Sequence, residues 1–319
     1  MRKSGIIYSL AFLFALCVPM LGIYPIFMMK LLCFALFACA FNLLLGFSGM
    51  LSFGHAAFFG TAAYATGWLV TAHGWGTVPA ILAGVVVAAA LGLIIGLIAI
   101  RRRGIYFAMV TLALAQLVYF VCLEAPFTGG ENGLQDVPRG SLFGLLTLKS
   151  DVAMYYVVLA VFAAVFALIR RIVHSPFGQV LKAIRDNEPR AISLGYDVNR
   201  YKLLAFVLSA ALSGLAGSLK TLVLGFTTLS DVLQANSGEV ILMTLLGGSG
   251  TFFGPVIGAA LVVTLQEYLS DIVGGWVTVI IGGVFVACVL AFRRGIVGEL
   301  AALRFRRRSP QPFAGDRQP

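Results

Sequence analysis

Charged residues are scarce in this sequence of 319 residues, where they make up 11% of the chain, against about 25% in ordinary soluble domains. Hydrophobic residues make up 60%, and the mean hydropathy is +0.97. This composition excludes a soluble globular domain, a disordered chain and a collagen-like fibre. The long runs without charge predict membrane-spanning helices and exclude the alternating strands of about ten residues that build outer-membrane barrels.

Motifs for catalysis and for metal or nucleotide binding are missing as well. A phosphate-binding loop needs GxxxxGK[ST], and the nearest run, at 214–221, has Leu219 in place of the second glycine. The sequence contains no HExxH, no G-x-S-x-G and no CxxC. We therefore expect no catalytic residue, no metal and no cofactor on this chain. We expect the cysteines to be small buried apolar residues: Cys17, Cys33, Cys39, Cys122 and Cys288.

Windows without charged residues mark the candidate membrane spans, because a helix needs about 20 apolar residues to cross a bilayer. The window 240–266 is too long for one ordinary span, and a Gly- and Pro-rich stretch at 247–255 divides it into two short crossings. We predict an all-α, polytopic membrane protein of about ten transmembrane helices, some broken or re-entrant, in one domain over residues 1–308. The windows are 5–23, 31–45, 47–70, 78–100, 104–123, 152–169, 203–219, 240–266 and 276–292.

Lysine and arginine are concentrated in four segments that share one side of the predicted membrane. Nineteen of the 23 lie at 2–3, at 101–103, in the loop 170–202 or in the tail from 293. The positive-inside rule therefore places these segments and both termini in the cytoplasm, and it places the loop 124–151 on the outer side. The tail 309–319 is predicted to be disordered.

Two Gly-rich breaks resemble each other. The run LLGFSG at 44–49 is similar to LLGGSG at 245–250, although chance could produce such a match in a chain with 36 glycines. Because Gly-interrupted segments mark mid-membrane pathways, we predict that both breaks line a pathway. For His55, the alternative to a pathway role is a buried ring that is hydrogen-bonded to a neighbouring hydroxyl or carbonyl. The candidate residues are Gly46, Ser48, Gly49, Ser52, His55, Gly247, Ser249 and Gly250.

Small residues recur at four-residue spacing in several spans. Examples are Ala210 and Gly214, Gly92 and Gly96, and the series 250, 254 and 258. This spacing is typical of close packing between membrane helices.

The loop 170–202 carries signals for two short helices. Ser175 before a proline is a typical N-cap, and four apolar residues from 177 to 184 follow at helical spacing. Asn187 can cap a second helix that begins at Glu188, and Gly195 can end it in the left-handed conformation. Such a pair either lies on the lipid surface or docks into a groove of a soluble cytoplasmic partner.

Several stretches resemble the LivM-type permeases of branched-chain amino-acid ABC importers. The run Glu188-Pro-Arg-Ala191-x3-Gly195 is similar to the coupling-helix motif of ABC importer permeases. Residues 46–64, 103–113, 128–133, 175–178 and 201–206 are similar to other stretches of the family, in the same order, and the resemblance covers about residues 35–295. The coupling segment reads Glu-Pro-Arg-Ala where the family has Glu-Ala-Ala, so only Glu188, Ala191 and Gly195 carry over from the motif. Arg185 joins them as a candidate for coupling to an ATPase subunit.

The resemblance implies a multi-pass permease of the bacterial inner membrane that translocates branched-chain amino acids by alternating access. Its implied partners are a second homologous permease, two cytoplasmic ATPase subunits that carry the ATP and Mg, and a periplasmic binding protein. Contact with membrane lipid is expected, and nucleic acid is not.

Other functions stay open at this stage. Urea, amides or other small amino acids are alternative substrates within the family, and a stand-alone secondary carrier or channel is an alternative mechanism. The absence of a buried chain of Asp, Glu and His favours ATP-driven transport over ion coupling. An intramembrane enzyme would need an acid–base or metal site that the sequence does not offer.

Overall fold

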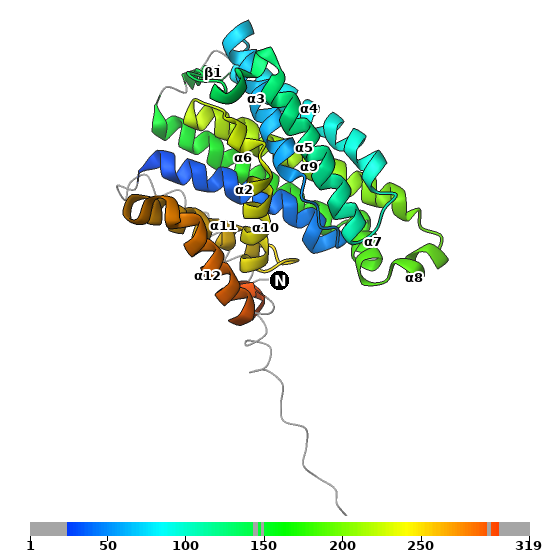
Figure 1. Cartoon of the computed structure of the whole chain (residues 1–319). Helices are drawn as coiled ribbons and strands as arrows, with labels where there is room; N and C mark the ends of the chain where they lie inside the picture. The colour runs from blue at the N-terminus through cyan, green and yellow to red at the C-terminus, as the bar shows by residue number, and fades with distance from the viewer. Residues whose placement is uncertain (1–23, 143–145, 148–149, 292–294, 300–319) are drawn as a thin grey trace, which may run out of the picture.

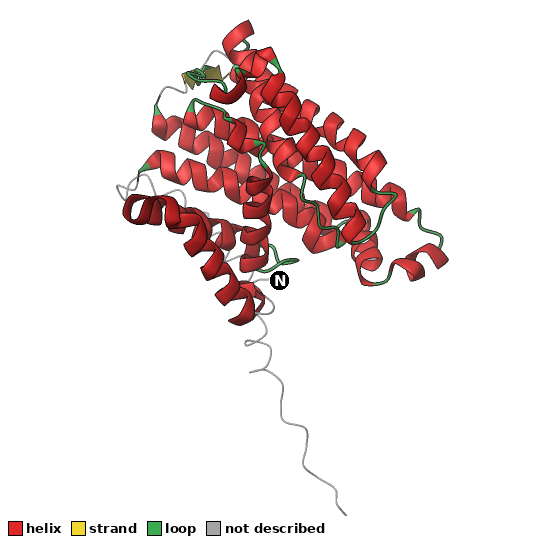
Figure 2. Ribbon diagram, in the orientation of Figure 1, coloured by secondary structure: helices red, strands yellow, loops and turns green. Residues whose placement is uncertain are grey.

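The computed structural model describes residues 24–142, 146–147, 150–291 and 295–299, which are almost wholly helical (Figure 2). The predicted first span, 5–23, and the tail 309–319 lie outside the described residues. The helices are α2 (Pro25–Ser48), α3 (His55–His73), α4 (Thr77–Ala99), α5 (Ile105–Glu124), α6 (Asp151–His174), α7 (Pro176–Asp186), α8 (Glu188–Ser193), α9 (Val198–Leu224), α10 (Gln234–Gly247), α11 (Gly254–Val273) and α12 (Val277–Ala291).

Short elements occupy the connections. Single 3-10 turns are η2 (Pro126–Thr128), η3 (Gly130–Asn132), η4 (Leu229–Asp231) and η5 (Gly274–Trp276). The strands β1 (Ser141–Leu142) and β2 (Leu146–Thr147) form a small antiparallel hairpin within the loop 124–151.

Five helices are long and apolar enough to cross a membrane: α2, α4, α5, α6 and α9. The window 240–266 is divided at its Gly/Pro stretch into α10 and α11, as predicted. The prediction of one span over 47–70 is wrong, because α2 continues to Ser48 and a non-helical stretch at 49–54 separates it from α3. Gly49 ends α2 in the left-handed conformation, with φ +73°, which a residue with a side chain rarely adopts.

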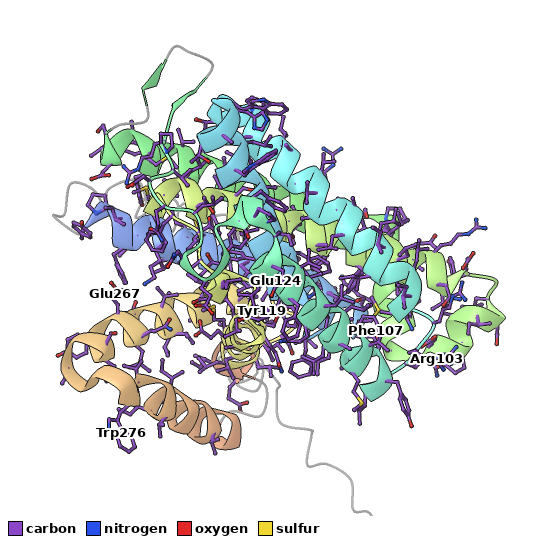
Figure 3. The ribbon with its side chains drawn as sticks, turned by 45° about the horizontal axis from the view of Figure 1, so that its top comes forward. Arg103, Phe107, Tyr119, Glu124, Glu267 and Trp276 are labelled. Atoms are coloured by element: carbon purple, nitrogen blue, oxygen red, sulfur yellow. The ribbon has the colours of Figure 1, made fainter. Side chains whose placement is uncertain are left out.

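The basic loops gather at one end of the bundle, which we call the basic end. Arg103 Nη2 lies 3.2 Å from Glu188 Oε1, and this ion pair joins the loop 101–103 to α8. Residue 295, which follows α12, lies against Gly248 at this same end. Figure 3 labels Arg103 at one end of α5 and Glu124 at the other.

The opposite end, which we call the distal end, carries the loop 124–151. Thr77 Oγ1, at the start of α4, donates to the carbonyl of Arg139 at 2.9 Å. The Arg139 side chain in turn donates to the carbonyl of Val223, near the end of α9, at 3.0 Å. The loops 124–151 and 170–202 therefore lie at opposite ends of the bundle, as the charge pattern predicts (Figure 1).

Helices α2 and α9 form the centre of the bundle. In α2, 83% of the apolar window is buried, and in α9 61%, whereas α4, α5 and α6 bury only about a third or less of theirs. Cys33 and Cys39 on α2 and Cys122 on α5 are free and buried, which confirms the prediction for these three residues.

Small residues let α9 approach α3 and α4 closely, as predicted from their spacing. A Cβ at Gly214 would overlap the Ala88 side chain of α4, and one at Gly217 would overlap the Phe59 carbonyl of α3. Thr66 of α3 bonds across this contact to Ser218 of α9, with 2.8 Å between the hydroxyl oxygens.

We predict that Gly217→Ala destabilises the bundle by about 1–3 kcal/mol, because the new methyl group forces two packed helices apart. The measurement is the thermal unfolding of the purified protein in detergent. Gly238→Ala on α10 is the matched control, because a Cβ there meets nothing within 4 Å. Equal melting temperatures for the two variants would contradict this packing.

Candidate functional site

The two Gly-rich breaks meet in space at the basic end. Asn42 Nδ2 donates to the carbonyl of Thr251 at 2.9 Å, and the Gly250 N–H donates to Asn42 Oδ1 at 2.9 Å. A Cβ at Gly46 would overlap the backbone of Gly250, so only glycine allows this approach. We call Asn42, Gly46, Gly250 and Thr251 the junction. The similar runs at 44–49 and 245–250 are therefore neighbours in the fold.

A side chain from the basic loop reaches into the junction. Arg185 Nη1, at the end of α7, donates to the carbonyl of Gly46 at 2.6 Å. A Cβ at Gly49 would contact the stem of Arg185, and one at Gly250 would lie 3.4 Å from its Nη1. The guanidinium also bonds to the carboxylate of Asp186 at 3.1 and 3.2 Å. Arg185 thus links α7 directly to the place where α2 ends and α11 begins.

The two predicted helices of the loop are confirmed, with the predicted caps. The Ser175 side chain accepts the N–H of Gly178 and begins α7, and the Asn187 side chain accepts the N–H of Arg190 and begins α8. Gly195 follows α8 with φ +84° and open space around the position of a Cβ. This conformation favours glycine.

Glu188 and Ala191 face the body of the protein. Glu188 Oε2 lies 2.8 Å from Lys202 Nζ of α9, and its other oxygen pairs with Arg103. Ala191 is 2% exposed and packs with Ile184 of α7 and Val198 of α9. These two residues therefore hold α8 against its neighbours, and they are not its outer surface.

The outer surface of this segment includes three exposed apolar side chains, which the motif comparison did not reveal. Ile192, Leu194 and Tyr196 are 49%, 68% and 40% exposed around the exposed Gly195. The signal available in the sequence was the alternation of these three apolar residues beside the terminal glycine. We call Ile192, Leu194, Gly195 and Tyr196 the α8 tip.

His55 is packed among aromatic rings at the start of α3. It is 0% exposed, and the rings of Phe41, Phe58 and Phe206 lie 4.9–5.9 Å from its own. Its Nε2 lies 2.9 Å from Ser209 Oγ, which donates its own proton to the Ala40 carbonyl. The ring therefore donates from Nε2, as in the alternative of a buried histidine bonded to a hydroxyl.

The two serines near His55 also bond locally. Ser48 donates to the Leu44 carbonyl at 2.6 Å, and Ser52 accepts the Gly54 N–H at 3.2 Å. Ser48, Ser52 and His55 line neither of two pockets found among the described residues. Their role in a pathway stays a prediction, as does that of Gly247 and Ser249 beside the junction. Gly247 packs against the backbone of Gly254 across the α10–α11 break.

Metal binding finds no support in the described part of the chain, where no three or more His, Cys, Asp or Glu side chains group around a common point. The junction and the loop that contacts it offer hydrogen bonds, an ion pair and apolar contacts. Through these contacts the loop 170–202 is joined directly to the junction.

Comparison with known proteins identifies relatives across most of the chain. A family model described as the permease component of branched-chain amino acid transport systems matches residues 24–289. The chain is 31% identical over 282 residues to the high-affinity branched-chain amino acid transport system permease protein LivM of Salmonella typhimurium, which covers 80% of this chain and 65% of that protein. The LivM protein of Escherichia coli is 30% identical over 279 residues, with the same coverage.

Another relative, which matches a smaller part of the chain, is named for a different class of solute. The ribose import permease protein RbsC of Bacillus subtilis is 29% identical over 152 residues, which covers 46% of this chain and 44% of that protein. The match to the two LivM proteins spans slightly less than two thirds of their length. No solved structure matches it significantly.

Proposed function

The chain belongs to the family of permease components of branched-chain amino acid transport systems, and on this premise we propose that it is the transmembrane permease subunit of an ATP-driven importer. Its substrates are branched-chain amino acids, as the names of the LivM relatives state for those proteins. The observation that carries the proposal is the bond from Arg185 to Gly46, because it joins a loop outside the helix bundle to two helix breaks within it.

The proposed assembly lies in the bacterial inner membrane. This chain crosses it many times, with both termini and the loop 170–202 in the cytoplasm and the loop 124–151 in the periplasm. A second homologous permease completes the pore, and a periplasmic binding protein delivers the substrate to it. Two cytoplasmic ATPase subunits bind ATP and Mg. The steep bias of Lys and Arg toward the basic end supports this orientation.

The α8 tip is the proposed contact with an ATPase subunit. Its apolar side chains are exposed at the end of a short helix and in the turn that follows it, and a short helical segment with apolar anchors fits a groove on a soluble partner. Gly195 lies within this contact surface. Glu188 and Ala191 lie on the inner side of this surface. Their ion pairs and packing hold α8 to α9 and to the loop 101–103, so these segments move together.

Arg185 is the proposed transmission between the ATPase subunits and the pathway. When ATP binding moves α7 and α8, the bond to the Gly46 carbonyl passes the movement to the junction. The pathway candidates there are Gly46, Gly49, Gly247, Ser249 and Gly250, with Ser48, Ser52 and His55 on the α2–α3 side. Glycine-containing breaks bend more readily than continuous helix, so alternating access begins at the junction.

The direct test is import by the assembled transporter. We expect proteoliposomes that hold this chain, the second permease and the ATPase subunits to take up radiolabelled L-leucine when binding protein is outside and ATP is inside. Excess isoleucine or valine should compete, whereas urea and acetamide should not. Import by this chain alone under an ion gradient would identify a secondary carrier and overturn the proposal.

The docking role of the α8 tip predicts the effect of a charge at its most exposed apolar residue. We expect Leu194→Asp to lower the affinity for the ATPase subunits at least about tenfold, because an apolar anchor is replaced by a carboxylate that must be desolvated. Co-purification and titration by light scattering measure it. Leu194→Met should bind normally, and Gln179→Asp, on the exposed surface of α7, is the matched control for charge. Equal affinity for Leu194→Asp and Gln179→Asp would remove the tip from the interface.

The transmission role of Arg185 predicts uncoupling. We expect Arg185→Gln to lower leucine import about tenfold at unchanged ATPase binding, because a charge-assisted hydrogen bond of about 1.5–3 kcal/mol to Gly46 is lost. The measurement is the number of leucine molecules imported for each ATP hydrolysed. Arg200→Gln is the matched control, since Arg200 pairs with Asp197 on its own turn, has no other ion pair with a described residue, and has a side chain that is 84% exposed. An unchanged ratio for Arg185→Gln would show that movement reaches the pathway by another route.

A further inference from the structure

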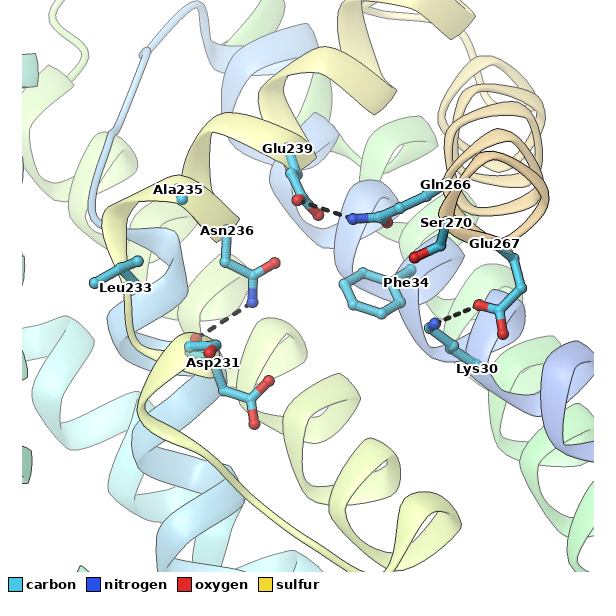
Figure 4. Close-up of a pocket in the computed structure, with 11 residues that line it drawn as sticks. Lys30, Phe34, Asp231, Leu233, Ala235, Asn236, Glu239, Gln266, Glu267 and Ser270 are labelled. Atoms are coloured by element: carbon cyan, nitrogen blue, oxygen red, sulfur yellow. Dashed lines mark hydrogen bonds and ion pairs between the residues drawn. The ribbon is translucent and has the colours of Figure 1, made fainter. Parts of the chain in front are cut away.

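A charged pocket lies between α2, α11 and the start of α10, in the distal half of the bundle (Figure 4). Its volume is about 480 Å³, within the range of about 300–1,000 Å³ that is typical of small-molecule sites. Of two pockets found among the described residues, this one has charged lining residues, whereas the other is lined mostly by apolar side chains. Its polar lining comes chiefly from Lys30, Asn236, Glu239, Gln266, Glu267 and Ser270.

Two charged side chains on this face lie within the length of their helices. Lys30 lies five residues into α2, and Glu267 lies six residues before the end of α11, so each is roughly 8–9 Å from its helix end at 1.5 Å per residue. Their ion pair is 2.6 Å long, and the side chains are 29% and 52% exposed. Charges at such a depth are costly in hydrocarbon, and they face water or protein.

One carboxylate of the pocket, that of Glu239, forms no ion pair with a described residue. Glu267 pairs with Lys30, and Asp231 pairs with Lys220, with 2.7 Å between Nζ and Oδ2. Glu239 Oε1 accepts a hydrogen bond from Gln266 Nε2 at 3.2 Å, and the described residues give it no ion pair. A ligand with a positive group would balance this charge.

A buried amide oxygen points into the same space. Asn236 is 9% exposed, and its Nδ2 donates to the Asp231 carbonyl at 3.4 Å. Its Oδ1 accepts no hydrogen bond from any described residue, and Figure 4 shows it directed toward the interior of the pocket. Asn236 and Glu239 lie one turn apart on α10, so both acceptors face one position.

The pocket also offers positive and apolar partners. Lys30 supplies an ammonium group. Helix α10 begins at this pocket without a side-chain cap, so its start adds partial positive charge. Phe34, Leu233 and Ala235 form the apolar part of the lining. Negative, positive and apolar groups thus surround one small volume.

We propose that this pocket is a transit site for a free α-amino acid, and this inference rests on the proposed function. The α-ammonium contacts Glu239 and Asn236, the α-carboxylate contacts Lys30 and the start of α10, and the aliphatic side chain packs on Phe34 and Leu233. The 14-residue helix α10 carries the site at its start and ends at the junction. Movement of the junction therefore moves one wall of the site.

The test is covalent labelling of the complete transporter in nanodiscs with L-photo-leucine, a diazirine analogue of leucine, followed by peptide mass spectrometry. We expect the label on residues 30–34, 230–239 and 266–270. Excess L-leucine should abolish it, and 4-methylpentanoate, which lacks the ammonium group, should not. We expect Glu239→Gln to weaken labelling about tenfold, the loss that corresponds to a hydrogen bond between charged groups.

A second variant and a control protect the test against loss of folding. Ser270→Phe adds bulk at an exposed lining position, and it should block labelling while the complex stays assembled on size exclusion. Glu124→Gln, an exposed glutamate at the distal end of α5, should label like the wild type. Wild-type transporter that imports leucine but carries the label elsewhere, or Glu239→Gln that labels normally, overturns the transit site and leaves the proposed function standing. Failure of ATP-driven leucine import overturns the proposed function itself.

Discussion

The hydrogen bonds of Asn42 hold together the two places where the chain leaves helical geometry inside the bundle. Within the hydrocarbon of a bilayer, a backbone group that has left its helix must find a partner in the protein or face a water-filled cavity. One planar amide supplies an acceptor for the Gly250 N–H and a donor for the Thr251 carbonyl. The absence of a side chain at Gly46 lets the two backbones approach. The end of α2 and the start of α11 both depend on this exchange.

The breaks also make α10 a short element with two functional ends. The helix has 14 residues, fewer than the roughly 20 that cross a bilayer. Before it, the buried ion pair of Lys220 and Asp231 fixes η4 against α9. After it, the junction connects to Arg185. The basic loop, the junction and the charged pocket are thus connected through α10 and the contacts at its two ends.

Much of this arrangement follows from the sequence because the signals are local. The caps at Ser175, Asn187 and Gly195 predict α7 and α8 correctly, since two depend on a side chain and the third on a glycine backbone, each within three residues of a helix end. The charge bias likewise predicts which loops share an end of the bundle. Contacts between distant segments do not follow, because no pattern announces them.

Three examples show where sequence reasoning stops. Asn42 carries no motif, and its role appears only when residues more than 200 positions away fold beside it. Glu188 and Ala191 match a family motif, yet both face the body of the protein, and the exposed apolar residues lie beside them in the sequence. Lys30 stands alone in an apolar run, and only the fold brings Glu267 and Glu239 to it.

The central burial of α2 has a further consequence for biosynthesis. Helix α2 leaves the ribosome long before the C-terminal helices that cover it, so Asn42 enters the membrane without its hydrogen-bond partners. Until synthesis is complete, the high hydropathy of α2 is what keeps this helix inserted.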